Sequence, residues 1–255
     1  MKNIAIVTGA SSGMGKEFAT TVQDNISVDE MWVIARRKER LEELQKEVNI
    51  PLKVIALDLS IDESFKKIGD LLKKEKPSIK LLINASGYGK FEKITSISNE
   101  DNMGMIDLNV KALTNMCLTC IPYMQRGSQI INFASVAAFQ PVPYINVYAA
   151  TKAYVLSFSR SLNVELKNEG IKVLAVCPFW TKTEFFDRAV TENKVIKKYV
   201  AMYNSKDVVK KAWKDYKKGK DISIYGFNAN LQRVIGKLLP HRLIMSLWLK
   251  QQKIK

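Results

Sequence analysis

The sequence predicts an α/β fold, in which a doubly wound parallel sheet carries helices on both of its faces. Short runs of β-branched and other apolar residues alternate with segments of helical periodicity from the first residues to about position 225. The 255 residues are 47% hydrophobic and 25% charged, which suits one large domain with a substantial core. No linker rich in Gly, Pro or Ser divides the chain.

The apolar runs give the expected strands, and the segments between them give the expected helices. We expect strands at residues 4–8, 31–35, 52–57, 80–83, 129–134, 172–176 and 222–225. We expect helices at residues 14–23, 38–47, 61–74, 103–124, 147–168 and 207–217.

The charge of the chain is strongly basic, with 40 Lys and Arg against 25 Asp and Glu and a formal net charge of +15. Such a charge could attract nucleic acid, an anionic membrane surface or anionic small molecules. The lysines are spread over many predicted helices, and no basic stretch is interleaved with aromatic residues that would stack on bases. We therefore expect a solvated basic surface and no nucleic-acid partner.

The counts of cysteine and histidine restrict the possible chemistry. His241 is the single histidine, which excludes histidine-dependent triads and sites with several histidine ligands. Cys117 and Cys120 form a C-x-x-C without a second pair, so we expect buried thiols and no metal. No signal peptide and no apolar run long enough to span a bilayer is visible, and we expect a cytoplasmic protein.

The turn after the first expected strand is rich in glycine. Glycines at such a turn let the backbone approach a pyrophosphate, which then lies at the positive N-terminus of the following helix. The T-G-x-x-x-G-x-G spacing here differs from the usual G-x-G-x-x-G, but its place between strand and helix indicates a dinucleotide site in a Rossmann-type fold. The expected phosphate-side residues are Gly9, Ser11, Ser12, Gly13, Met14 and Gly15.

Two arginines, Arg36 and Arg37, follow the second expected strand. Folds that bind NAD usually carry an acidic residue there, which accepts hydrogen bonds from the ribose 2′-hydroxyl. A guanidinium suits a 2′-phosphate instead, because it is permanently charged and matches phosphate oxygens bidentately. We therefore expect NADP as the cofactor, although an ordinary basic start to the next helix would give the same residues.

Tyr148 and Lys152 are four residues apart and share one face of an expected helix. An ammonium beside a phenol favours the phenolate and lowers the pKa of the tyrosine from about 10. Such a tyrosine could give a proton to a carbonyl or take one from an alcohol. By itself the pair is weak, since a half-buried ring beside a solvated charge has the same spacing.

Taken together, residues 3 to about 226 resemble the short-chain dehydrogenase/reductase family. The family has an asparagine on a catalytic helix, matched by Asn109, and a catalytic serine, matched by Ser135, which precedes Tyr148 by the usual 13 residues. The resemblance departs from the family at the family's Asn-Asn-Ala-Gly, here Asn84-Ala85-Ser86-Gly87, and at its Pro-Gly motif, where Phe179 replaces the glycine. The further cofactor-binding residues that the resemblance implies are Asp58, Leu59, Asn84, Ala85, Gly87, Tyr148, Lys152, Pro178, Thr181 and Thr183.

The resemblance implies an oxidoreductase that interconverts a carbonyl and a secondary alcohol by hydride transfer from a nicotinamide. Tyr148 would be the acid or base, and Lys152 would lower its pKa and hold the nicotinamide ribose. Ser135 would hydrogen-bond the reacting oxygen, and Asn109 would position a water that links Lys152 to solvent. Ser135 could instead cap a turn, and Asn109 could instead hydrogen-bond to helix backbone.

Aromatic and apolar residues flank the expected site, as at Phe179-Trp180 and Phe185-Phe186. They favour a bulky hydrophobic substrate, such as a hydroxysteroid, a bile acid or a fatty-acyl ketone, unless they only pack a lid against the core. A reductase of ketoacyl groups on a carrier protein, and a non-catalytic sensor or scaffold that binds NADP, are the alternatives. Both Tyr148 and Lys152 are present, which counts against the sensor.

The pattern changes after the last expected strand, and we divide the chain into a Rossmann-type catalytic domain at 1–226 and a basic amphipathic helical tail at 227–255. The apolar residues of the tail recur at helical spacing on both sides of Pro240. We expect the tail to cover the substrate pocket or to form a subunit contact, and a peripheral membrane contact is the other use of such a stripe. By family analogy, the helices at 103–124 and 147–168 would form the interface of a homo-oligomer, a dimer or a tetramer.

Overall fold

The computed structural model describes residues 1–254, and a seven-stranded sheet runs through its centre in the order β3-β2-β1-β4-β5-β6-β9. Every neighbouring pair of strands is parallel. The predicted doubly wound parallel sheet is therefore confirmed. The strands are β1 (Asn3–Thr8), β2 (Glu30–Ala35), β3 (Leu52–Ala56), β4 (Ser78–Asn84), β5 (Met124–Phe133), β6 (Lys172–Val176) and β9 (Ile222–Ser223).

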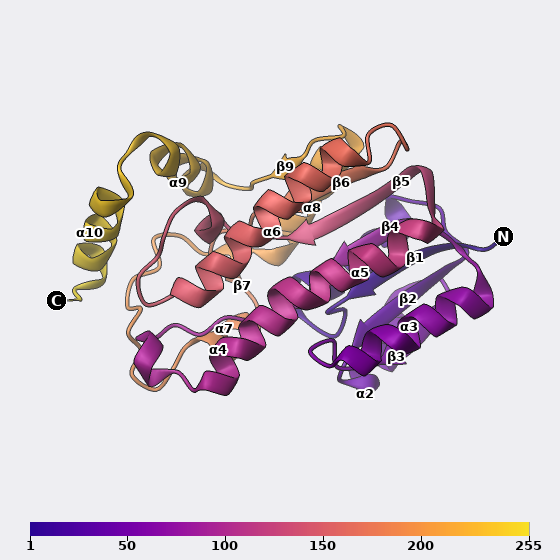
Figure 1. The fold of residues 1–255 in the computed structure, drawn as a ribbon, viewed down its shortest axis with the longest axis horizontal. Coiled ribbons are helices and arrows are strands. Elements are labelled where there is room, and N and C mark those ends of the chain that lie inside the picture. Colours follow the sequence, from indigo (N-terminus) through magenta and orange to yellow (C-terminus); the bar gives the residue numbers. More distant parts are fainter. Residues whose placement is uncertain (255) are drawn as a thin grey trace.

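Three helices cover each face of this sheet (Figure 1). Successive side chains of a strand point to opposite faces, so in β1 Ile4 and Ile6 join one core cluster while Ala5 and Val7 join the other. Strands buried on both faces explain why the apolar runs of the sequence are continuous. The first face carries α3 (Asp62–Glu75), α5 (Ala112–Cys120) and α6 (Asn146–Glu165), and the second α1 (Gly13–Thr21), α2 (Lys38–Leu44) and α8 (Ser205–Lys217).

The strand order reverses between β1 and β4, which are hydrogen-bonded neighbours although two strands, β2 and β3, lie between them in the chain. In open α/β sheets such a switch point leaves a crevice at the carboxyl ends of the strands. Gly9 leaves β1 here with a φ of +68°, and a Cβ on it would lie 2.8 Å from the carbonyl carbon of Ala85. Only glycine fits this position, because an L side chain would be strained and would also meet the backbone of the neighbouring connection.

The long helix expected at 103–124 is divided, and its predicted bounds are wrong. Helix α4 (Asn99–Ile106) begins earlier, because the Ser98 hydroxyl caps it by accepting a hydrogen bond from the Asp101 amide at 3.0 Å. A π-helical turn at Asp107–Lys111 connects α4 to α5, and α5 ends before Pro122. The π-helical turn has no sequence signal of its own.

Some short elements have no counterpart in the sequence prediction. They are the two-stranded sheet β7 (Thr181–Lys182) and β8 (Tyr203–Asn204), and the single-turn helix α7 (Phe185–Ala189). Elements of two to five residues are too short to show a period. Conversely, β9 covers only two residues of the strand expected at 222–225.

The predicted helical tail is confirmed as α9 (Phe227–Leu238) and α10 (His241–Gln252), which the turn at Pro240 separates. Both helices lie at one end of the molecule, opposite the N-terminus (Figure 1). Within residues 1–254, no helix is both long and apolar enough to cross a membrane. The three cysteines are free thiols and are buried, as expected.

The short last strand depends on a buried carboxylate. Asp215 in α8 is 1% exposed, accepts a hydrogen bond from Ser223 in β9 at 2.8 Å and pairs with Lys220 at 3.0 Å and with Lys211. Burial alone would raise the pKa of Asp215, but the hydrogen bonds from the two lysines and from Ser223 bring the pKa below its usual value. The ionised form is therefore the stabilising one.

We expect Asp215→Asn to lower the free energy of unfolding at pH 7 by about 2 kcal/mol, because hydrogen bonds to a buried charge are lost. Since the folded-state pKa of Asp215 is depressed, the variant should show its full loss of unfolding free energy above the unfolded pKa of the carboxyl. The difference from the wild type should diminish as the pH falls below that value. Urea unfolding at several pH values measures both effects. The control is Asp221→Asn, which removes an exposed pair with Arg160 and should change the stability by about 0.5 kcal/mol or less. Equal losses in the two variants would contradict the assignment.

Candidate active site

Two adjoining cavities open at the carboxyl ends of the strands. The larger, of about 850 Å³, lies over the glycine turn, and the smaller, of about 350 Å³, lies over Ser135 and Tyr148. A molecule in one cavity would reach into the other, because six residues line both. The shared residues are Met14, Ala85, Gly87, Phe133, Thr183 and Phe185.

The glycine turn gives the larger cavity a wall made of backbone. A Cβ on Gly15 would lie 2.3 Å from the Gly9 carbonyl oxygen, so the first turn of α1 packs directly on the end of β1. Ser12 precedes α1 without a side-chain cap, and the first turn of the helix has no acidic residue. No side chain therefore competes for the N-terminal amides of α1 or for the positive end of its helix dipole. Both are available to an anion, and these residues fit a dinucleotide pyrophosphate.

Charged side chains surround the other end of this cavity. Arg36 lies 3.7 Å from Asp58, and Arg37 lies 3.0 Å from Glu184, which also pairs with Arg40. Burial alone would raise the pKa of Asp58, but hydrogen bonds from Ser60 and the charge of Arg36 bring it below its usual value. Hydrogen bonds from Arg40 and Arg37 lower the pKa of Glu184. Both carboxyls are therefore ionised at neutral pH. Each pairs with arginine guanidinium groups that could otherwise bind a phosphate.

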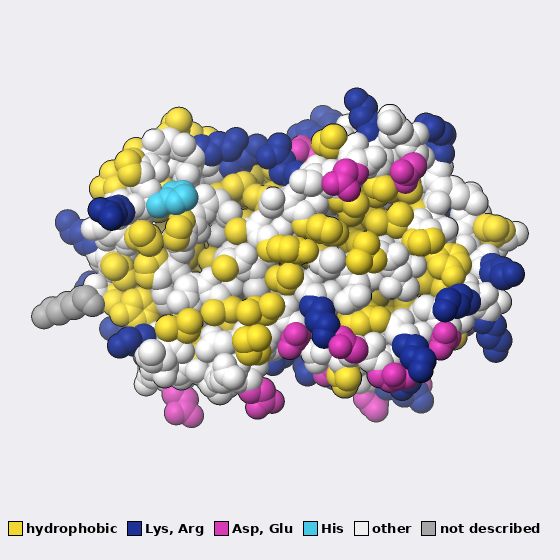
Figure 2. All heavy atoms as spheres, in the orientation of Figure 1, with side chains coloured by type: hydrophobic (Ala, Val, Ile, Leu, Met, Phe, Trp, Pro, Cys, Tyr) yellow, Lys and Arg dark blue, Asp and Glu magenta, His cyan; other side chains and the backbone are white. Residues whose placement is uncertain are grey.

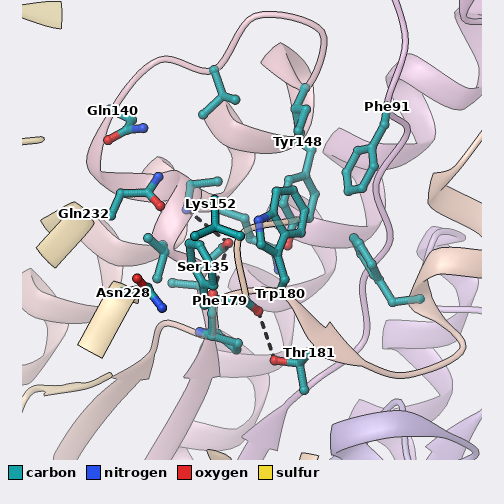
Figure 3. Close-up of a pocket in the computed structure, with 18 of the residues that line it drawn as sticks. Phe91, Ser135, Gln140, Tyr148, Lys152, Phe179, Trp180, Thr181, Asn228 and Gln232 are labelled. Carbon is teal, nitrogen blue, oxygen red and sulfur yellow. Dashed lines mark hydrogen bonds between the residues drawn. The ribbon is translucent and has the colours of Figure 1, made fainter. Parts of the chain in front are cut away.

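Ser135, Tyr148 and Lys152 lie together on the wall of the smaller cavity (Figure 3). Ser135 follows β5 and caps a short 3-10 helix, with its hydroxyl accepting a hydrogen bond from the Ala137 amide at 3.1 Å. Tyr148 and Lys152 come from the first two turns of α6, as their spacing predicted. The Lys152 Nζ lies 5.6 Å from the centroid of the Tyr148 ring.

Aromatic groups hold the Tyr148 ring in place. The ring centroids of Phe91 and Phe185 lie 6.4 Å and 5.5 Å from that of Tyr148. A Cβ on Gly89 would lie 2.9 Å from Tyr148 Cδ2 and 3.0 Å from Phe185 Cζ, so only glycine lets the chain pass this close to the two rings. In Figure 3 the phenol lies beside Phe91, and Asn228 and Gln232 lie on the side of Ser135 away from Phe91.

The protonation of the pair differs from the expectation that Lys152 lowers the pKa of Tyr148. Burial raises the pKa of Tyr148 to about 12, and a hydrogen bond from Ser135 opposes this only in part. Burial also lowers the pKa of Lys152 to about 8, while its Nζ donates a hydrogen bond to the Phe133 carbonyl at 2.7 Å. With no anion beside it, the ammonium is destabilised by its surroundings, and its effect on the phenol is smaller than that of burial.

Asn109 and Asn84 lie near this site but line neither cavity. The Asn109 amide binds the backbone of Tyr88 on both sides, accepting from its N–H at 3.0 Å and donating to its carbonyl at 2.8 Å, and also donates to Thr151. Asn84 is 2% exposed and donates to the Asn132 side chain at 2.9 Å. The Asn84 side chain therefore points into the core and away from both cavities, and a cofactor contact of this residue stays a prediction.

The remaining predicted residues all line one of the two cavities. Around the larger lie Gly9, Ser11, Ser12, Gly13, Met14, Gly15, Arg36, Arg37, Asp58, Leu59, Ala85, Gly87 and Thr183. Around the smaller lie Pro178 and Thr181 with Ser135, Tyr148 and Lys152.

Several residues that line the cavities were not predicted from the sequence. Phe91 lies in a connection with no recognisable motif, and Gln140, Asn228 and Gln232 have ordinary sequence surroundings. The apolar periodicity of the tail was the one signal, since Ile235, Ile244, Leu247 and Trp248 complete the wall.

The chain belongs to the short chain dehydrogenase family, whose pattern it matches over residues 3–194. It is 31% identical to sulfoacetaldehyde reductase 2 of Chromohalobacter salexigens, over 72% of this chain and 75% of the relative. It is 32% identical to the very-long-chain 3-oxoacyl-CoA reductase of Rattus norvegicus, over 71% of this chain and 60% of the relative. A short-chain dehydrogenase from Sphingobium yanoikuyae, solved in complex with NADPH, superposes with a TM-score of 0.78 at 26% identity and 96% coverage of both chains.

We expect Lys152→Met to raise the free energy of unfolding at pH 7 by about 2 kcal/mol, because it removes a buried ammonium with a depressed pKa. The unfolded lysine, with a pKa near 10.5, binds more protons than the folded one between pH 8 and 10.5, so wild-type stability rises with pH in that window. The advantage of the variant should therefore shrink there. Urea unfolding from pH 7 to 10 measures the difference.

Lys167→Met is the control for this prediction, because Lys167 is exposed and follows the same helix. Its effect on the free energy of unfolding at pH 7 should be about 0.5 kcal/mol or less. A Lys152→Met variant less stable than the wild type at pH 7, or a difference independent of pH, would contradict the buried-ammonium interpretation.

Proposed function

We propose that this short-chain dehydrogenase is an NADP-dependent oxidoreductase that interconverts a bulky hydrophobic carbonyl and its secondary alcohol. One observation carries the proposal. Ser135, Tyr148 and Lys152 lie on one wall of an apolar cavity, and this cavity joins the glycine-lined cavity that fits a dinucleotide. The nicotinamide would supply or accept the hydride when bound, and the chain's residues would position the substrate and manage the proton.

In this mechanism the Ser135 hydroxyl donates a hydrogen bond to the substrate oxygen and fixes its distance from Tyr148. Tyr148 then gives its proton to that oxygen in reduction, or takes one from the alcohol in oxidation. Lys152 holds the nicotinamide ribose and returns the proton to the phenolate. Asn109 acts indirectly, by fixing the backbone at Tyr88 and the Thr151 hydroxyl beside this wall.

The raised pKa of Tyr148 keeps the phenol in its protonated form, which is the form that acts as an acid in carbonyl reduction. A phenol with a pKa of about 12 is fully protonated at neutral pH and is ready to act as an acid. Transfer of the phenol proton to the alkoxide that develops on the substrate is still favourable, since an alkoxide is a stronger base than the phenolate of Tyr148. Oxidation would first require loss of that proton, for which Lys152, with its pKa near 8, is the adjacent acceptor once neutral.

Three arginines support NADP over NAD. Arg36, Arg37 and Arg40 line the ribose end of the larger cavity, where an NAD-selective fold would carry an acid. The relative from Sphingobium yanoikuyae was solved with NADPH. Glu184 and Asp58 are the competing carboxylates, and a 2′-phosphate would have to displace Glu184 from Arg37 or share it.

The lining of the smaller cavity supports a bulky hydrophobic substrate. Phe91, Phe179, Trp180 and Phe186 form aromatic walls, and the helices of the tail close the far side. The two reductases to which the chain is similar are named for very different substrates, a sulfonated aldehyde and a long acyl thioester, so the lining is the better guide. A fatty-acyl ketone or a hydroxysteroid fits an apolar cavity of about 350 Å³.

Two further parts of the proposal concern the organisation of the chain. Residues 1–226 form the Rossmann-type catalytic domain, and 227–255 form a tail whose inner face is the substrate lid. The outer sides of α5 and α6, which expose Leu118 and Val164, provide the contact of a homo-oligomer. A reductase of carrier-bound ketoacyl groups remains the second candidate. The relative from Rattus norvegicus, which is named for a 3-oxoacyl group on coenzyme A, favours the ketoacyl part of this candidate and not the carrier.

We expect Tyr148→Phe to reduce kcat by about 10²–10⁴-fold with little change in the Kd of NADPH, because only the proton donor is lost. Absorbance at 340 nm, a wavelength fixed by the cofactor, follows turnover on hydroxysteroids, fatty-acyl ketones and small aldehydes. The control is Tyr154→Phe on the same helix, whose hydroxyl lies 3.1 Å from Thr114 outside both cavities. Tight NADPH binding by the wild type without turnover on any compound would favour a sensor.

We expect Arg36→Asp to lower the ratio of kcat/KM for NADPH to that for NADH by about tenfold or more, since a bidentate phosphate contact becomes a repulsion. The aspartate would also accept hydrogen bonds from a ribose 2′-hydroxyl. Steady-state kinetics with both cofactors measure the ratio. Lys46→Asp, an exposed site away from the cavity with the same charge change, should leave it unchanged. An unaltered ratio in Arg36→Asp would overturn the NADP assignment at this residue.

A further inference from the structure

Helix α9 exposes four large apolar side chains to solvent, while Ile235 lines the smaller cavity and the small residues of the helix face inward. Ala229 and Gly236 face the body of the protein, where a Cβ on Gly236 would lie 2.9 Å from the Phe139 carbonyl oxygen. Helices that face water normally show the opposite arrangement. The outward apolar residues recur at intervals of four, three and four, so they form one stripe. They are Phe227, Leu231, Val234 and Leu238, exposed by 78%, 44%, 49% and 76%.

Helix α10 is held firmly against the body by its inner face. The Trp248 indole N–H donates to the Pro143 carbonyl at 3.0 Å, and Ile244 is 5% exposed. The Gln252 side chain is fully buried and makes three hydrogen bonds to the backbone of Lys197 and Lys198. The outer side of α10 exposes Leu243 and Leu247, which continue the stripe of α9.

The charged residues of the tail are all basic. Residues 227–255 contain six Lys and Arg and no Asp or Glu. The basic side chains of Lys237, Arg242, Lys250 and Lys253 are exposed on the same two helices. Figure 2 shows yellow apolar side chains gathered at this end with dark blue basic ones among them. We call the exposed apolar stripe with these four basic residues the tail face.

The tail face also borders the entrance of the smaller cavity. Leu231 and Leu247 line that cavity and are 44% and 52% exposed, and Val200, from the segment before β8, lines it and is 60% exposed. An apolar compound that leaves the cavity therefore arrives among exposed apolar side chains and not in a polar loop.

We propose that the tail face docks on an anionic lipid bilayer surface and that the hydrophobic substrate passes between bilayer and cavity at this contact. The apolar stripe would enter the headgroup–acyl boundary, and the basic residues would contact anionic headgroups. A second copy of this chain is a poorer occupant. Two tail faces would bring basic residues together with no carboxylate between them. The passage of substrate rests on the proposed function, whereas the docking does not.

Flotation of the full chain with vesicles tests the docking. With phosphatidylcholine–phosphatidylglycerol vesicles we expect binding at least about tenfold tighter than with phosphatidylcholine alone, weakening as salt is added. Phe227→Ser combined with Leu238→Ser should weaken it by about tenfold or more, because two side chains no longer leave water. Lys237→Gln, Arg242→Gln and Lys250→Gln together should weaken it by a similar factor.

The matched control changes three exposed lysines of α3 that form no salt bridge, Lys66→Gln, Lys67→Gln and Lys73→Gln. It removes the same charge far from the tail and should bind vesicles like the wild type. Equal weakening in this control, full binding by the Phe227→Ser, Leu238→Ser variant, or no binding of the wild type to either vesicle would overturn the proposal. A concentration-dependent dimer in light scattering that this variant abolishes would also overturn it, in favour of a second copy.

Turnover separates this proposal from the catalytic one. None of the altered tail residues lines a cavity, so their variants should reduce a water-soluble ketone at the wild-type rate. Reduction of a ketone held in anionic vesicles should fall about tenfold in the Phe227→Ser, Leu238→Ser variant. Lost vesicle binding with retained turnover in solution would indicate failure of docking alone.

Discussion

The reversal of strand order between β1 and β4 is the constraint on which the rest of this structure depends. It opens the crevice in which both cavities lie, and it requires backbone to approach backbone at its base. The sheet satisfies that requirement with glycine, since a Cβ on Gly15 or Gly9 would meet main-chain atoms within 3 Å. The N-terminus of α1 then faces the crevice without a side-chain cap, and the fold leaves a positive end for an anion to fill.

The proposed catalytic pair, Tyr148 and Lys152, lowers the stability of the folded chain. Lys152 is 5% exposed, has the Phe133 carbonyl as its partner and has no carboxylate beside it. A buried ammonium of this kind destabilises the folded chain at neutral pH and persists where function requires it. Tyr148, raised in pKa by the same burial, is thereby held as an acid. The cofactor, when bound, would add hydrogen-bond acceptors beside Lys152 and would change this balance in favour of the charged lysine.

The tail has an inner side that packs against the body of the protein and an outer side that is exposed. Its inner residues, among them Trp248 and Gln252, are fixed to the body by hydrogen bonds and close the substrate cavity. Its outer residues remain apolar and uncovered, in a protein whose other surfaces are rich in charge. In the proposed docking, the tail would bring the hydrophobic cavity next to a hydrophobic source without an intervening passage through water.

The sequence by itself determined the fold class, the parallel sheet and the positions of the main catalytic candidates. Each of these follows from local patterns: apolar periodicity, a glycine turn at a strand end, and the four-residue spacing of Tyr148 and Lys152. Only the tertiary structure decided which side chains meet. It turned Asn84 into the core, connected Arg37 to Glu184 across 147 residues, and placed Phe91 and Gln232 around the cavity. It also decided the protonation of Tyr148, because desolvation depends on the packing of segments that are distant in the chain, and no local pattern records that packing.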